Sequence, residues 1–160
     1  MMSLNQLSLK HLLQSYRGFA ILFTILAFVG FLDAMFLTIE HVLEAPVPCS
    51  IIGGCETVLT STYSEIGGIP VAFFGVLYYA SIFLLALLSL TRMEKKYVVL
   101  ASKLTFAGLC VSLVLVFLQL FVIKAICVYC MLSALTSMAL FVAGMFALRQ
   151  NKKWEIISQP

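Results

Sequence analysis

The chain has 160 residues, of which 62% are apolar and only 11% are charged, and its formal net charge is +3. A soluble domain carries about 25% charged residues, so this composition excludes a soluble enzyme, a secreted soluble domain and a disordered tail. The small net charge, without a basic cluster interleaved with aromatic residues, also argues against binding to nucleic acid.

Apolar runs of about 20 residues, the length that crosses a bilayer, predict four membrane-spanning helices in contact with lipid. They are expected at residues 18–39, 71–90, 104–123 and 126–148. The first run is longer than the apolar core of a secretory signal and no small-residue cleavage site follows it, so we interpret it as a retained span. The predicted fold is an all-α membrane protein, a four-helix bundle formed by a single domain over residues 1–160.

Basic residues lie mostly on one side of the predicted membrane. Nine of the ten flank the spans on the side of the termini, whereas Lys124 lies on the other side. The positive-inside rule then places both termini in the cytoplasm. The large loop at residues 40–70, between the first two spans, is expected to be extracytoplasmic. This pattern predicts a multi-pass protein of the inner (cytoplasmic) membrane.

Four of the five cysteines fall on the predicted extracytoplasmic side. Cys49 and Cys55 lie in the large loop, and Cys127 and Cys130 form C-V-Y-C at the start of the fourth span. The unpaired amides of a helix N-terminus stabilise a thiolate, and only a thiolate attacks a disulfide. The C-x-x-C pair is therefore expected to exchange disulfides, while Cys110 inside the third span is expected to be a small packed hydrophobe.

Two dithiols on one side of a membrane predict an electron relay. No haem, flavin or nucleotide-binding motif is present, so a lipid-soluble acceptor such as a quinone is the simplest destination for the electrons. A zinc site built from both pairs is an alternative, although the C-x5-C spacing is unusual for zinc. No metal is expected. The alternative from another class is a non-catalytic tetraspan scaffold with structural disulfides.

Two further polar residues, Asp33 and Gln119, are candidates for the site. Asp33 lies inside the first span, where a carboxylate is a functional candidate; it either provides a proton route to a reduced quinone or is hydrogen-bonded within the bundle. Gln119, in the third span, is expected to make a helix–helix hydrogen bond, with a pocket role as the alternative. His41 is expected at the membrane interface.

Three motifs occur in order along the chain: C-S-I-I-G-G-C-E-T-V-L-T-S-T-Y-S, then G-I-P-V-A-F-F-G-V-L-Y-Y, then C-V-Y-C. Together they resemble the vitamin K epoxide reductase family, most closely its bacterial disulfide-forming branch without a fused thioredoxin-like domain. The likeness covers roughly residues 15–148. It implies a four-helix bundle around a quinone, either ubiquinone or menaquinone, with its C-x-x-C at the extracytoplasmic end of the fourth helix.

The resemblance also implies roles for individual residues. Cys130 would lie next to the quinone with Cys127 as its exchange partner. Cys55 would form a mixed disulfide with Cys127, and Cys49 would exchange with a separate thioredoxin-fold, DsbA-like protein outside the cytoplasm. Ser61 would lie against the redox centre, and Phe74 and Gly75 close to the quinone.

Two positions depart from the animal enzymes of that family. These carry an asparagine and a tyrosine where this chain has Val71 and Ala134. We therefore expect a thiol–quinone oxidoreductase that generates disulfides, with a vitamin K quinone or epoxide reductase as the alternative within the same class.

Overall fold

The computed structural model describes residues 4–43, 54–92 and 94–158. Its long helices are α1 (Leu4–Val42), α3 (Val71–Arg92), α4 (Lys95–Phe117) and α5 (Val128–Ser158), and a π-helical turn, η1 (Leu118–Ile123), follows α4 directly. The short elements α2 (Cys55–Leu59), β1 (Glu65–Ile66) and β2 (Ile69–Pro70) lie between α1 and α3 in the sequence.

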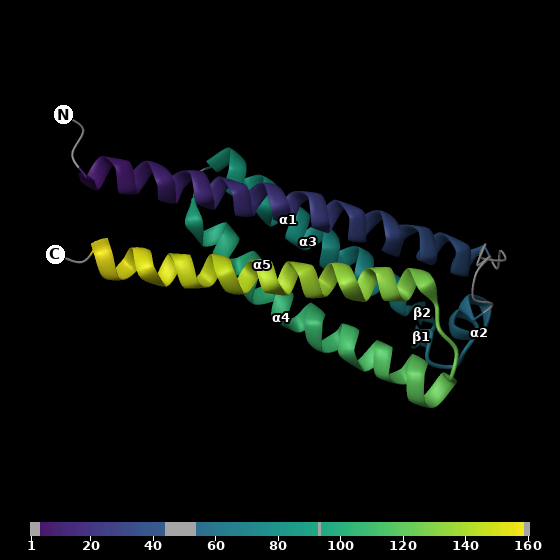
Figure 1. Cartoon of the computed structure of the whole chain (residues 1–160). Helices are drawn as coiled ribbons and strands as arrows, with labels where there is room; N and C mark the ends of the chain where they lie inside the picture. The colour runs from purple at the N-terminus through teal and green to yellow at the C-terminus, as the bar shows by residue number, and fades with distance from the viewer. Residues whose placement is uncertain (1–3, 44–53, 93, 159–160) are drawn as a thin grey trace.

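Four helical segments are long and apolar enough to cross a membrane. They are Arg17–Val42, Val71–Arg92, Lys96–Ile123 and Val128–Gln150. Helix α1 packs against α3 and α5, and α4 packs against α5 and α3, so the four helices form one bundle (Figure 1). This confirms the predicted all-α membrane fold with its large loop between the first two spans.

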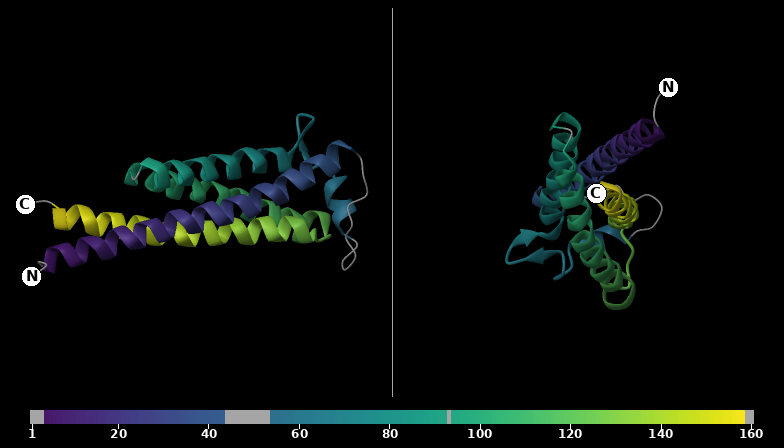
Figure 2. Two further views of the ribbon diagram at one scale, coloured as in Figure 1. Left: turned by 90° about the horizontal axis from the view of Figure 1, so that it is seen from above. Right: turned by 90° about the vertical axis from the view of Figure 1, so that its left-hand side faces the viewer.

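The short elements gather at one end of the bundle. The start of α1 and the end of α5 lie at the opposite end, as the views in Figures 1 and 2 agree. Helix α2 contacts η1 at this end, whereas β2 contacts α1 and α3. The C-x-x-C motif and Cys55 are both at this end.

Several helix boundaries differ from those suggested by the apolar runs: α1 begins at Leu4 rather than at residue 18, and α5 continues to Ser158 rather than ending at residue 148. Helix α4 begins at Lys95 rather than at residue 104, because its first turns also bury apolar side chains; Val98 and Ala101 are 3% and 1% exposed. Helix α5 begins at Val128 rather than at residue 126. Lys124 adopts the left-handed backbone conformation, with φ of 56°, and this ends η1 and starts a short non-helical connection.

Small residues on α1 allow its neighbours to approach closely. Buried positions recur along α1 every three or four residues, as expected for one packed helix face: Ala20, Phe23, Ala27, Gly30, Ala34 and Leu37. A side chain at Gly30 would overlap the ring of Tyr79 on α3. Small residues at such contacts are typical of helices that associate in a membrane.

A tight hairpin joins the loop to α3. Strands β1 and β2 pair antiparallel, with Ile66 opposite Ile69, and the turn between them is made by Gly67 and Gly68 with φ of 63° and 80°. Two successive positive φ angles suit glycine and close a two-residue hairpin. The backbone N–H of Val71 also donates to the carbonyl of Ser64 at 2.8 Å, which ties the hairpin to the first residue of α3.

Candidate active site

Cys127 sits immediately before the first turn of α5 and is fully buried. Its backbone carbonyl accepts the N–H of Met131 at 3.0 Å. A hydrogen bond from the Cys130 thiol lowers the pKa of Cys127 to about 7, and the backbone N–H groups of Cys130 and Tyr129 act in the same direction. Burial and the negative charge of Asp33 oppose this shift. The first-turn amides therefore contribute to a thiolate at Cys127, as predicted for a cysteine at a helix N-terminus.

Cys55, the first residue of α2, lies next to Cys127. Both side chains are 0% exposed, and they share one buried cluster with Val58, against which Tyr129 and Cys130 pack. Cys55 is disulfide-bonded, whereas Cys127 and Cys130 are free thiols. The structure thus brings together three of the four predicted redox cysteines; Cys49 lies outside the described residues.

Gly54 explains how α2 can approach the C-x-x-C so closely. A Cβ atom at this position would lie 2.6 Å from the carbonyl oxygen of Ile126 and 2.8 Å from its nitrogen. The backbone of the loop therefore rests directly on the backbone of the residue before Cys127. Only glycine permits this contact without displacing one of the two segments.

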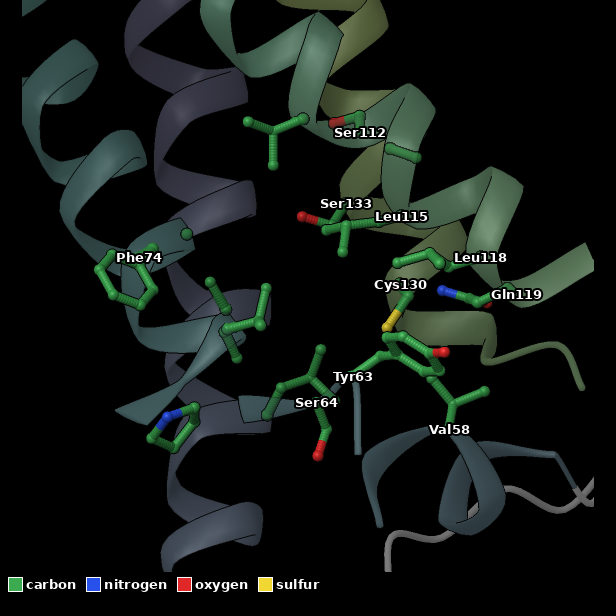
Figure 3. A pocket seen from close by; sticks show the side chains of 18 of the residues that line it. Val58, Tyr63, Ser64, Phe74, Ser112, Leu115, Leu118, Gln119, Cys130 and Ser133 are labelled. Carbon is green, nitrogen blue, oxygen red and sulfur yellow. The ribbon is translucent and has the colours of Figure 1, made fainter. Parts of the chain in front are cut away.

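A cavity of about 430 Å³ lies beside this cluster, a volume suited to a small ligand. All four long helices and the loop contribute to its mostly apolar lining. Figure 3 shows the sulfur of Cys130 turned toward the cavity beside Tyr63, with Phe74 on the opposite wall. Cys130 is therefore the member of the C-x-x-C pair that faces the cavity.

Three further predicted site residues also line the cavity, namely Ser61, Phe74 and Gly75. The Ser61 hydroxyl donates to the carbonyl of Val58 at 2.7 Å, which caps the end of α2. Gly75 has a packing role as well, because a Cβ there would be 3.3 Å from the Cβ of Ala34 on α1.

Asp33 is buried at 8% exposure but does not belong to the cavity lining. Its carboxylate acts electrostatically on Cys127 and on Tyr79. Within the part of the chain that the structure describes, neither carboxylate oxygen has a hydrogen-bond partner. The structure therefore places Asp33 near the cysteine pair rather than on the wall of the cavity.

Two residues that line the cavity were not expected in the site from the sequence. Tyr78 lines the cavity, and its hydroxyl lies against the backbone of Gly108 on α4. His41, expected at the membrane interface, also lines the cavity and contacts Glu65 at 2.8 Å, which links the end of α1 to β1. Aromatic and histidine residues near span ends are too common for the sequence alone to identify these contacts.

Tyr79 lines the cavity and fixes α3 to α5. It is 1% exposed, and its hydroxyl donates to the carbonyl of Ser133 at 2.8 Å. The hydroxyls of Ser133 and Ser137 lie 3.0 Å from the same oxygen. The position of Ser133 on the cavity wall therefore depends on a buried hydrogen-bond network.

The model of the vitamin K epoxide reductase family matches residues 21–145. The match includes the lining segments of all four long helices, α2 and the C-x-x-C motif. The chain belongs to this family. Members of the vitamin K epoxide reductase family are quinone-linked thiol oxidoreductases or reductases, so this chain is a membrane oxidoreductase of that general class.

Proposed function

We propose that this protein oxidises the dithiol of an extracytoplasmic thioredoxin-fold protein and transfers the electrons to a membrane quinone, thereby sustaining disulfide formation. The observation that supports this most directly is the burial of Cys55 and Cys127 in one cluster, with Cys130 facing an apolar cavity. A scaffold with structural disulfides would not require a free, fully buried thiol beside a disulfide-bonded cysteine.

The first exchange occurs in the loop. A thiolate of the DsbA-like partner attacks Cys49 of a Cys49–Cys55 disulfide and releases Cys55 as a thiolate. The second thiol of the partner then attacks the mixed disulfide, so the partner leaves oxidised and the loop pair is reduced. Two electrons and two protons are transferred in this step.

The second exchange takes place in the buried cluster. The Cys55 thiolate attacks Cys127 of a Cys127–Cys130 disulfide, and Cys130 leaves as a thiolate. Cys49 then attacks Cys55, which restores the loop disulfide and frees Cys127. The resulting pattern is an oxidised Cys55 beside free Cys127 and Cys130, and these three cysteines have this pattern in the structure.

The last step returns the inner pair to a disulfide. The cavity fits a quinone ring because it is apolar, is lined on one side by the loop and is faced by the sulfur of Cys130. A bound ubiquinone or menaquinone would accept the two electrons and two protons of the dithiol. Phe74 and Gly75 would contact the ring, and Ser61 would hold the end of α2 over the redox centre.

Asp33 is proposed to move protons for this step. Burying a carboxylate without a hydrogen-bond partner costs several kcal/mol, and its carboxylate lacks one among the described residues. Ionisable residues retained inside a membrane at such a cost usually serve function. Its electrostatic influence on Cys127 supports a role at the thiols rather than at the cavity wall.

Two cavity positions favour thiol oxidation over reduction of vitamin K epoxide. Val71 and Ala134 replace the hydrogen-bonding residues of the animal enzymes, and both line the cavity. The cavity therefore presents apolar groups at these positions. The charge asymmetry of the chain further supports an inner-membrane protein with cytoplasmic termini and an extracytoplasmic site.

The test is quinone reduction by the purified protein in detergent. A reduced thioredoxin-fold oxidase is supplied with ubiquinone or menaquinone, and quinone absorbance is followed. We expect wild type to consume quinone, and Ser substitution of Cys49, Cys55, Cys127 or Cys130 to abolish this. Cys110→Ser is the matched control, because Cys110 is a free thiol exposed on α4, not packed as expected from the sequence. Undiminished turnover in Cys127→Ser, or no turnover of either quinone by folded wild type, would contradict the proposal.

A further inference from the structure

Gln119 is a buried amide on the turn that precedes the C-x-x-C motif. It is 3% exposed, belongs to η1 and lines the cavity beside Cys130. A π-helical turn inside a membrane helix is uncommon and often marks a functional site. Here the turn carries the Gln119 side chain to the end of the bundle where α5 begins.

Both the backbone and the side chain of Gln119 hold the connection to α5. Its backbone carbonyl accepts the N–H of Ala125 at 3.2 Å. Its side-chain oxygen accepts the N–H of Cys127 at 3.0 Å. The backbone of the exchanging cysteine is therefore attached to α4 by a side chain eight residues earlier in the sequence.

The Cys127 N–H also determines how the amide is oriented. Because that group is a donor, the amide must present its oxygen to it, and the NH₂ group must point elsewhere. Figure 3 shows the nitrogen of Gln119 directed toward Cys130. Gln119 and Cys130 also line the same cavity. One amide thus binds the backbone of Cys127 and is placed beside Cys130.

We propose that Gln119 is a positioning residue of the redox centre, whose amide holds the Cys127 backbone and donates a hydrogen bond to Cys130 as it leaves. The inference rests on the proposed function. When Cys55 attacks Cys127, the Cys55–Cys127 bond forms, the Cys127–Cys130 bond breaks and the electron pair remains on Cys130. Cys127 is then held in the mixed disulfide and no longer has a thiol proton to donate. The NH₂ group of Gln119 remains as a donor to the Cys130 thiolate.

Removing this donor should change the redox equilibrium of the inner pair. In the reduced pair the Cys130 thiol donates to the Cys127 thiolate, so a donor to the Cys130 sulfur also supports that charge, and hydrogen bonds to charged groups are worth more than neutral ones. Stabilising the reduced form in this way makes a dithiol pair more oxidising. In Gln119→Met we expect the equilibrium of Cys127–Cys130 to shift about tenfold toward the disulfide, a change of about 30 mV for two electrons. The exchange of Cys55 with Cys127 should slow by about 10- to 100-fold.

The experiment uses the full-length protein in detergent without quinone, so that its outcome does not depend on quinone turnover. The protein is equilibrated with mixtures of reduced and oxidised dithiothreitol, free thiols are alkylated, and the inner disulfide is quantified by mass spectrometry. Gln119→Glu is the second variant, because it keeps an acceptor for the Cys127 N–H and replaces the NH₂ group by an oxygen. We expect it to shift the equilibrium in the same direction.

Leu120→Ala is the matched control, since Leu120 is 47% exposed in the same turn, and it should leave the equilibrium unchanged. A merely structural role for Gln119 would lower stability in both variants without moving the potential of the folded protein. An equilibrium and an exchange rate within twofold of wild type in either folded variant would overturn the inference. If wild type does not turn over quinone, the proposed function is refuted, but the equilibrium of the Cys127–Cys130 pair can still be measured.

Discussion

Gly54 provides a sharp test of the contact between the loop and the inner cysteine pair. In Gly54→Ala the new Cβ would lie 2.6 Å from the oxygen and 2.8 Å from the nitrogen of Ile126. Comfortable contacts lie at about 3.5 Å, so α2 and Ile126 must separate by roughly 0.7–0.9 Å. The backbone of Gly54 itself is not strained, because its φ of −97° is open to alanine. The substitution therefore acts only by increasing the distance between α2 and Ile126.

Such a displacement moves Cys55 away from Cys127. A misplacement of about 1 Å between reacting groups can cost about 100-fold in rate, so we expect the exchange to slow by about 10- to 100-fold. The assay uses a Cys130→Ser background, in which the Cys127 thiolate attacks Cys55 of the Cys49–Cys55 disulfide, forms the Cys55–Cys127 bond and releases Cys49 as a thiolate. Its formation is followed on non-reducing gels after a pulse of oxidised partner, which re-forms the loop disulfide in the reduced protein.

Gly18→Ala is the matched control for this change. It adds the same methyl group to a long helix, where nothing lies within 4 Å of the new atom. It should form the mixed disulfide at the rate of the parent protein. If Gly54→Ala also did so, the close approach of α2 to Ile126 would not determine the reaction of Cys55 with Cys127, and our reasoning would fail.

Three further predictions follow from single contacts. The Cys127 thiolate should form with a midpoint near pH 7 and be lost as the pH falls below it. Cys130→Ala should raise this midpoint toward about 8.5, measured by the ultraviolet absorbance of the thiolate in a Cys110→Ser background. An unchanged midpoint would show that the hydrogen bond from Cys130 is unimportant. In Gly108→Ala the new Cβ would overlap the ring of Tyr78 and should push this ring toward the cavity. The variant should therefore raise KM for quinone roughly tenfold and leave dithiol exchange unaffected. An unchanged KM would contradict this. Tyr79→Phe removes a buried hydroxyl that contacts Ser133 and Ser137 and should lower the free energy of unfolding in detergent by about 1–3 kcal/mol, whereas wild-type stability would show that the network contributes little.

The sequence predicts the helices well because lipid imposes a simple rule. Each span needs a long apolar run, and such runs are visible without knowledge of packing. The start of α4 at Lys95 was not predicted, because a helix can continue past the bilayer wherever its backbone hydrogen bonds remain local. The hairpin at residues 65–70 was also missed, although Gly67-Gly68 carries a recognised turn signal.

The site is predictable where its chemistry is local. The lowered pKa of Cys127 depends on Cys130 and the first-turn amides, all within three residues of it. The contribution of Gln119 depends on a π-helical turn and on the path of the chain through Lys124, neither of which has a clear sequence signal. The contact of Gly54 with Ile126 joins segments far apart in the sequence, so it could be found only in three dimensions.

The complete burial of Cys127 beside α2 limits which thiols can react with it directly. A small thiol such as glutathione approaching from bulk solvent finds no exposed surface on this sulfur. Reducing equivalents would then reach this sulfur through Cys55, which is also fully buried. The inner cysteine pair would thereby accept electrons from the loop cysteines and not directly from small thiols in solution, so the membrane quinone would not be consumed by them.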